Sequence, residues 1–119
     1  MKEFNLKTGK LGEEIAKNYL EKKGYKILEQ NYKTKYGEID LVARDGRDLV
    51  VVEVRTKKGE MFGSPEDSLN KKKLRKIQLN TLAYSGKIRW KGPCRVDAVC
   101  LVLEINNAIK RLEHYQNIC

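Results

Sequence analysis

Two strand-like segments around Asp45-Gly46-Arg47-Asp48 constrain the fold of this chain more than any other feature of its sequence. Residues 38–44 and 49–55 are rich in apolar and β-branched side chains, and a polar Asp-Gly turn between such segments is typical of an antiparallel hairpin. The second segment begins with the apolar run 49–52, which predicts a central strand covered on both faces. Helices must therefore cover the sheet.

Two amphipathic helices are predicted on either side of this hairpin. Thr8 can cap the first, whose apolar residues recur at helical spacing until Gly24. Asn70 can cap the second, which Gly86 can end. Both helices have an apolar stripe to bury, so both are expected to pack on the sheet.

The remaining segments complete an α/β pattern. The order α-β-β-β-α-β plus a tail predicts a mixed central β-sheet flanked by helices, in a single domain over residues 1–119. The tail fits either an edge strand or a short helix, and its pattern does not decide between them. The other predicted strands cover residues 25–32 and 95–103, and the tail covers residues 108–119.

Composition narrows the class of partner. The chain is 40% hydrophobic and 34% charged with a formal net charge of +9, which indicates a folded protein with a strongly positive surface. Nucleic acid is the expected partner, although lysines that only maintain solubility are the alternative. An anionic membrane surface is disfavoured, because no basic helix carries a bulky apolar face.

The cysteines and the N-terminus bear on location. Cys94, Cys100 and Cys119 are odd in number and lack CxxC spacing, so we expect free thiols rather than a disulfide framework or a zinc site. Residues 1–10 contain no apolar signal segment, and no long apolar run occurs elsewhere. We therefore expect a cytoplasmic protein.

The hairpin predicts a pair of acidic side chains. If Arg44 pairs with Leu49 around a four-residue loop, counting back along both strands places Asp40 opposite Glu53. Opposed Cβ atoms lie about 4.5–5.5 Å apart, close enough for two carboxylates to bind one divalent cation. The alternative is a structural ion pair of either acid with Arg55. A register shift of one residue would place the two acids on opposite faces.

These residues also match a known signature. Asp40, followed on the next strand by Glu53-Val54-Arg55, resembles the D...(D/E)-X-K signature of the restriction-endonuclease-like superfamily. Further motifs together resemble the YraN-like uncharacterised family: residues 9–20 with Glu13 and Ala16, Gly37-Glu38-Ile39-Asp40-Leu41, Val52-Glu53-Val54-Arg55, Phe62-Gly63, the lysines before Leu74, and Arg95-Val96-Asp97.

The resemblance implies a fold and an activity. It implies the restriction-endonuclease-like three-layer core, similar to Holliday-junction resolvases, with Glu13, Asp40 and Glu53 around Mg²⁺ or Mn²⁺. Such a metal would hold the scissile phosphate and help to generate hydroxide. The expected substrate is DNA, branched DNA included, and the resolvase-like relatives commonly work as homodimers. Glu14 stays open as an alternative to Glu13. Glu38 is a weaker candidate, equally well explained as an exposed hairpin charge.

One position departs from the superfamily pattern. Lys usually stands where this chain has Arg55, and arginine effectively cannot lose its proton. Arg55 is therefore suited to orienting a phosphate or stabilising charge and poorly suited to acting as a general base. Lys57 could substitute only if the strand extends that far. Alongside a nuclease, we thus consider an inactive nucleic-acid-binding module that keeps the fold, and a scaffold protein whose acids pair internally.

Basic residues supply the expected nucleic-acid contacts. Lysines in the first turn of a helix oppose its dipole, so stability does not explain the cluster after Asn70. A solvated helix face is the alternative. Asp97 is expected to be a structural partner of a buried donor, and His114 a structural or surface residue. The expected phosphate contacts are Lys71, Lys72, Lys73, Arg75 and Lys76, supplemented by Lys33, Lys35 and Arg95.

Overall fold

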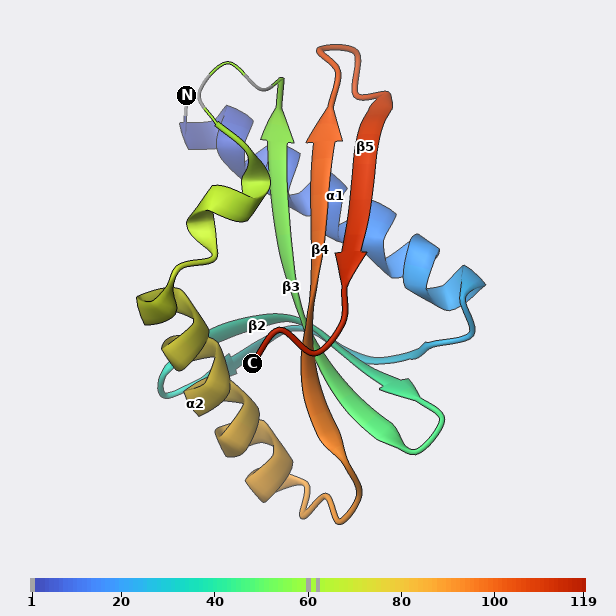
Figure 1. Cartoon of the computed structure of the whole chain (residues 1–119), viewed down its shortest axis with the longest axis vertical. Helices are drawn as coiled ribbons and strands as arrows, with labels where there is room; N and C mark the ends of the chain where they lie inside the picture. Colours follow the sequence, from blue (N-terminus) through green and yellow to red (C-terminus); the bar gives the residue numbers. More distant parts are fainter. Residues whose placement is uncertain (1, 60, 62) are drawn as a thin grey trace.

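The structure, a computed structural model, describes residues 2–59, 61 and 63–119, so Phe62 of the motifs above lies outside the described residues. Five strands form one sheet in the order β1-β2-β3-β4-β5 (Figure 1). The elements are α1 (Lys2–Lys22), β1 (Lys26–Thr34), β2 (Gly37–Asp45), β3 (Asp48–Lys58), the short 3-10 helix η1 (Pro65–Ser68), α2 (Lys71–Lys87), β4 (Cys94–Leu103) and β5 (Ile109–Tyr115).

The sheet is mixed. β3 and β4 pair in parallel, and the other three neighbouring pairs are antiparallel. The parallel pair requires a crossover connection, which η1 and α2 provide. The tail forms the edge strand β5, which decides the alternative that its sequence left open. The α/β prediction is confirmed, and the arrangement is compatible with a restriction-endonuclease-like three-layer core.

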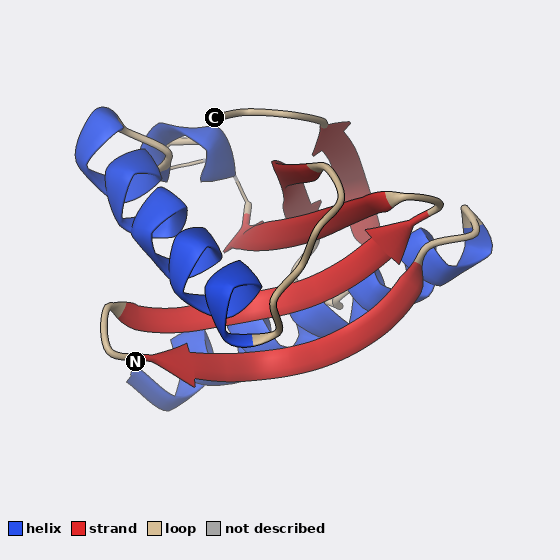
Figure 2. Ribbon diagram, turned by 90° about the horizontal axis from the view of Figure 1, so that it is seen from below, coloured by secondary structure: helices blue, strands red, loops and turns tan. Residues whose placement is uncertain are grey.

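The two helices cover opposite faces of the sheet (Figure 2). On one face, Ala16 and Leu20 of α1 join a buried cluster with Val50, Val52 and Val54 of β3. On the other face, α2 packs over Leu49 and Val51 through buried side chains that include Ile77 and Tyr84. Successive β3 residues therefore alternate between two cores, as the apolar run 49–52 predicted.

The hairpin between β2 and β3 has the predicted register and a tighter turn. Arg44 pairs with Leu49 as expected, and Asp45 pairs with Asp48 beyond them. The loop therefore holds two residues rather than four. Gly46 at its first position has φ 60°, a left-handed conformation that glycine adopts without steric cost.

Helix α1 begins earlier than the sequence suggested. It starts at Lys2, and Thr8 lies buried within it instead of capping it. The expected cap was wrong because burial against the sheet outweighs the intrinsic preference of threonine for helix ends. By contrast, Asn70 caps α2 as expected, accepting a 2.9 Å hydrogen bond from the Lys73 N–H. No helix among the described residues is both long and apolar enough to cross a membrane.

A close approach between α1 and β3 positions one wall of the candidate site. A Cβ atom at Gly12 would lie 1.8 Å from the Thr56 Oγ1 atom. Only glycine allows the helix backbone to lie this near to the strand. Since Glu13 follows Gly12 directly, the contact also fixes where α1 presents that carboxylate.

Candidate metal and nucleic-acid site

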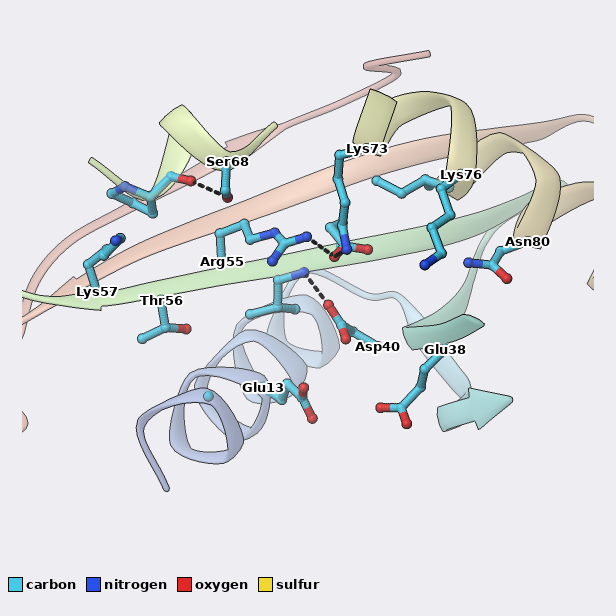
Figure 3. Close-up of a pocket in the computed structure, with 15 residues that line it drawn as sticks. Glu13, Glu38, Asp40, Arg55, Thr56, Lys57, Ser68, Lys73, Lys76 and Asn80 are labelled. Carbon is cyan, nitrogen blue, oxygen red and sulfur yellow. Dashed lines mark hydrogen bonds and ion pairs between the residues drawn. The ribbon is translucent and has the colours of Figure 1, made fainter. Parts of the chain in front are cut away.

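The site lies where β2 and β3 separate. The β2–β3 ladder runs from the hairpin turn to its last pair, Leu41 with Val52, and Asp40 and Glu53 are the next residues on the two strands. The Val54 N–H donates a 2.8 Å hydrogen bond to Oδ2 of Asp40 (Figure 3). A carboxylate thus accepts a hydrogen bond from a strand N–H just past the end of the ladder. Asp40 and Glu53 lie close together, as predicted.

Asp40 and Glu53 form an electrostatically strained pair. Glu53 is only 6% exposed. Burial and the neighbouring Glu53 raise the pKa of Asp40 to about 7, although the Val54 N–H and Arg55 counteract them. Burial also raises the pKa of Glu53, and the nearby Arg55 and Lys73 oppose that shift. With no cation beside them, the two carboxyl groups retain a proton more readily than exposed acids do.

Positive side chains contact Glu53. An Nη2 atom of Arg55 lies 2.8 Å from its Oε1 atom, and Nζ of Lys73 lies 3.9 Å from the same oxygen. The ion pair of Glu53 with Arg55, considered as an alternative from the sequence, is therefore present. Glu53, Arg55 and Lys57 all line the cavity. The ion pair between Glu53 and Arg55 therefore remains in contact with the cavity.

Glu13 approaches the pair from α1. It is half-buried and lines the same cavity as Asp40 and Glu53, whereas Glu14 is exposed. Burial raises the pKa of Glu13, and a hydrogen bond from Asn31 counteracts the shift. The exposed Glu38 of β2 also lines the cavity and accepts a hydrogen bond from Asn31. Of the two α1 candidates, the structure thus brings Glu13 to the acids.

These residues surround a cavity of about 480 Å³, and Figure 3 shows them directed into it from α1, the sheet and α2. Acids come from α1, β2 and β3 (Glu13, Asp40 and Glu53), and Arg55 of β3 and Lys73 of α2 lie next to Glu53. A cation and an anion could therefore bind next to each other. The lining residues are Gly9, Glu13, Glu38, Asp40, Glu53, Val54, Arg55, Thr56, Lys57, Pro65, Ser68, Lys73, Lys76, Ile77 and Asn80.

Two polar atoms at this cavity lack a partner within the described part of the chain. They are Nε of Arg55 and Oγ1 of Thr56, both buried. Buried donors without partners are costly, so such atoms usually bind water, an ion or a ligand. Both belong to β3, and Oγ1 of Thr56 faces Gly12 of α1.

Mg²⁺ requires oxygen ligands, and the carboxylates of the cavity supply them. Among the described residues, no three Asp, Glu, His or Cys side chains are grouped closely enough to hold a metal ion by themselves. Mg²⁺ usually binds through one or two carboxylates and completes its shell with water and substrate phosphate. Asp40 and Glu53, which line the same cavity, fit that pattern.

A family model described as Uncharacterised protein family UPF0102 matches residues 12–101, a span that contains Glu13, Asp40, Glu53 and Arg55. The chain belongs to the UPF0102 family. The UPF0102 protein of Thermodesulfovibrio yellowstonii is 41% identical over 112 residues, covering 94% of this chain and 95% of the relative. The UPF0102 protein of Thermotoga maritima is 44% identical over 109 residues, covering 92% and 94%. The YraN-like resemblance is thereby confirmed at the level of the family.

Apart from Arg95, the basic residues considered as phosphate contacts in the UPF0102 chain fall into three groups. Lys73 and Lys76 line the cavity with Arg55 and Lys57. A separate groove of about 470 Å³ between β1 and α2 contains Lys33 and Lys35, together with Lys87, which the sequence had not suggested. The exposed remainder of the α2 cluster consists of Lys71, Lys72 and Arg75.

Arg95 lies apart from these groups. Its guanidinium is 14% exposed and pairs with Asp97 at 3.0 Å and Asp45 at 3.1 Å, and it also contacts Asp48. The structure places Arg95 near the hairpin turn, where its donors are engaged by acids. We therefore leave it out of the candidate contact surface. The sequence pattern predicted Arg95 as a phosphate contact because it could not show that three aspartates surround its guanidinium.

Asp97 has the structural role expected of it. Besides Arg95, its carboxylate accepts a 3.1 Å hydrogen bond from the Asn117 N–H and lies 2.8 Å from Nε2 of His114. These contacts hold the pKa of Asp97 below its usual value despite burial. His114 is thus a partner of Asp97 in the structure, away from the acids of the cavity.

Proposed function

We propose that this protein is a metal-dependent nuclease of the restriction-endonuclease-like superfamily that hydrolyses DNA phosphodiester bonds. One observation carries the proposal: the half-buried Asp40 and the buried Glu53 are neighbours in a cavity that Arg55, Lys57, Lys73 and Lys76 also line. The acids suit a divalent cation, and the basic side chains suit the phosphate that such a cation would activate.

The cost of the acid pair argues for a cation. Two neighbouring carboxylates in a largely buried place repel each other, and Arg55 relieves only Glu53 directly. Leucine or valine would serve the core better at both positions. A cation between the acids would remove the repulsion and turn an unfavourable arrangement into a binding site.

Each side chain has a distinct part in the proposed reaction. Asp40 and Glu53 hold Mg²⁺ or Mn²⁺, and Glu13 contributes directly or through water. The chemistry that a bound ion supplies is polarisation of the scissile phosphate and a lowered pKa of attacking water. Arg55, which lines the cavity, donates to the phosphate through its guanidinium and stabilises developing negative charge.

The lysines position the nucleic acid. Lys57, Lys73 and Lys76 line the cavity and can contact the phosphates next to the scissile bond. Lys33 and Lys35 in the neighbouring groove extend the positive surface beyond the cavity. Such contacts act on the backbone, so they would position DNA with little preference for its sequence.

A catalytically inactive DNA-binding module is the second candidate, and the Arg55–Glu53 ion pair favours it. The 2.8 Å contact uses a carboxylate oxygen that a cation would need. Arginine also cannot supply the general base that a lysine at this position could supply. In this case the basic surface would bind DNA, while the acids would serve only to orient Arg55.

Calorimetric titration with MgCl₂ and MnCl₂ tests the site before a substrate is known. Wild type should bind one of the ions, whereas Asp40→Asn and Glu53→Gln should lose most of the affinity. Glu104→Gln, which neutralises an exposed acid near β5, is the matched control and should bind like wild type. A wild type that binds neither ion would overturn the nuclease proposal.

Cleavage assays then separate the two candidates. Single-stranded, duplex and branched DNA, with RNA forms for comparison, should be incubated with Mg²⁺ or Mn²⁺. Cleavage that Asp40→Asn abolishes supports the nuclease. Salt-dependent DNA binding without cleavage of any form supports the inactive module.

A further inference from the structure

Asn31 occupies a position in the sheet that ties it to the two acids. In the β1–β2 ladder, Gln30 pairs with Leu41 and Tyr32 pairs with Ile39, so the intervening Asn31 lies across from Asp40. On the other side of β2, the β2–β3 ladder ends with Leu41 and Val52, and Asp40 and Glu53 are the next residues on the two strands. Asn31 therefore lies next to the strand position that carries Asp40.

The backbone of Asn31 departs from strand geometry at this point. Its φ is 51°, in the left-handed region, although the residue lies within β1. Asparagine tolerates this region better than other side chains with a Cβ atom, but a strand interior gives no local reason for it. The unusual conformation changes the direction of the side chain relative to its neighbours in the strand.

The side chain so directed bridges two acids from different elements. The Nδ2 atom of Asn31 donates to Oε1 of Glu13 on α1 at 2.9 Å and to Oε1 of Glu38 on β2 at 3.1 Å. An amide nitrogen carries two hydrogens and no negative charge, so it can satisfy both carboxylates at once. Without it, Glu13 and Glu38 would repel each other across open solvent.

Glu13 and Glu38 both line the cavity, but Glu13 is the one that acts on Glu53. Glu13 is half-buried, whereas Glu38 is exposed. The negative charge of Glu13 helps to raise the pKa of Glu53, and Asp40 helps to raise the pKa of Glu13. The three acids therefore share one electrostatic environment, in which the orientation of Glu13 determines its distance from a bound cation.

We propose that Asn31 is a positioning residue of the site: its amide holds the Glu13 carboxylate toward Asp40 and Glu53, where Glu13 completes the environment of a divalent cation. This inference rests on the proposed metal-dependent function. Partners that orient metal ligands typically affect affinity by about 10- to 100-fold when they are removed. Asn31 should lie near the lower end, because Glu13 acts beside two stronger ligands.

The test variant is Asn31→Gly, which removes the amide and keeps a residue that tolerates a positive φ. Asn107→Gly is the matched control, since Asn107 has φ 71° and is exposed in the turn before β5. Titration with MnCl₂ and MgCl₂ should show about tenfold weaker binding for Asn31→Gly. Asn107→Gly should bind like wild type, and urea unfolding should show that both variants fold.

A double-mutant cycle identifies the acid through which Asn31 acts. In a Glu13→Gln background, Asn31→Gly should change cation affinity by less than about twofold, because the group it orients is gone. In a Glu38→Gln background, the full loss should persist. Loss of the effect with Glu38→Gln instead, or unchanged affinity in Asn31→Gly itself, would overturn the inference.

The failures of the two proposals are distinguishable. Suppose that wild type binds the ions, that Glu53→Gln loses this binding and that Asn31→Gly keeps it. The nuclease proposal then stands, and the role proposed for Asn31 is wrong. If wild type binds neither ion, the proposed function is wrong and the inference falls with it.

Discussion

Oδ2 of Asp40 accepts a 2.8 Å hydrogen bond from the N–H of Val54, next to the point where the β2–β3 ladder ends. The same carboxylate that we assign to cation binding therefore also satisfies a strand donor. A substitution at Asp40 can remove both the negative charge and the acceptor for the Val54 N–H, so the replacement must be chosen to separate these two effects.

Replacing Asp40 by asparagine or alanine should separate charge from hydrogen bonding. Both variants remove the negative charge, but only asparagine keeps an acceptor for the Val54 N–H. Leaving that donor without a partner costs about 1–3 kcal/mol. Urea unfolding at pH 8 should therefore show Asp40→Ala less stable than Asp40→Asn by about this amount. Equal stability of the two would show that water replaces the carboxylate at Val54.

The stability of the metal-free protein should depend on pH through Asp40. Its pKa rises from the usual 3.8 to about 7 on folding, so the folded state binds a proton more tightly than the unfolded state. The resulting stabilisation is complete below about pH 4 and is lost as the pH rises to about 7. The free energy of unfolding should fall by at most about 1.4 kcal/mol for each unit by which the pKa is raised. Between pH 5 and pH 8, wild type should lose stability relative to Asp40→Asn. If the free energy of unfolding depended on pH in the same way in both proteins, the raised pKa of Asp40 would be contradicted.

Arg55 should compete with the cation for Glu53. Its Nη2 atom lies 2.8 Å from the Glu53 Oε1 atom, an oxygen that the cation also needs. Arg55→Ala should therefore bind Mg²⁺ about tenfold more tightly, corresponding to about 1.4 kcal/mol and close to one charge-assisted hydrogen bond. Its DNA affinity should fall, because the phosphate loses a contact. Weaker binding of both ligands would instead indicate that Arg55 holds the site together.

Two glycines of α1 should respond in opposite ways to alanine. At Gly12 a Cβ atom would clash with Thr56, so Gly12→Ala should destabilise the protein by about 1–3 kcal/mol. At Gly9 no atom lies within 4 Å of the added Cβ, so Gly9→Ala should stabilise the helix by up to about 1 kcal/mol. Thermal unfolding of both variants measures the difference. Similar melting temperatures would mean that α1 does not depend on its close approach to β3.

The lysines of the cavity should account for part of the salt dependence of DNA binding. Lys73→Ala combined with Lys76→Ala should reduce the slope of log affinity against log salt by about 0.9 per lost duplex phosphate contact. The control is Lys22→Ala combined with Lys26→Ala, which removes the same charge from exposed positions at the end of α1 and the start of β1. Fluorescence anisotropy at several salt concentrations gives both slopes. Equal slopes would assign binding to net charge alone.

The contacts within the hairpin could be predicted because they are local. The Asp-Gly turn sets the pairing of Arg44 with Leu49, and that register continues to Leu41 and Val52, the residues next to Asp40 and Glu53. The continuous apolar run 49–52 of β3 similarly predicted that helices cover both of its faces. Likewise, Asn70 caps α2 through a neighbour only three residues along the chain.

The contacts of Asn31, Arg95 and Thr8 could not be predicted in this way. The amide of Asn31 meets Glu13 because α1 packs on the sheet, and Arg95 meets Asp45 and Asp48 because β4 lies parallel to β3. Such contacts join residues far apart in the sequence. Their formation depends on how whole elements pack, which the local pattern of side chains does not specify.

By itself, the sequence determined the strands, the hairpin register and the pairing of two acids, since turn geometry and side-chain alternation act over a few residues. Only the tertiary structure decided that Glu13 rather than Glu14 lines the cavity, that Arg95 is engaged by aspartates, and that the tail pairs with β4. The physical reason is that burial, desolvation and charge pairing depend on neighbours which folding brings together.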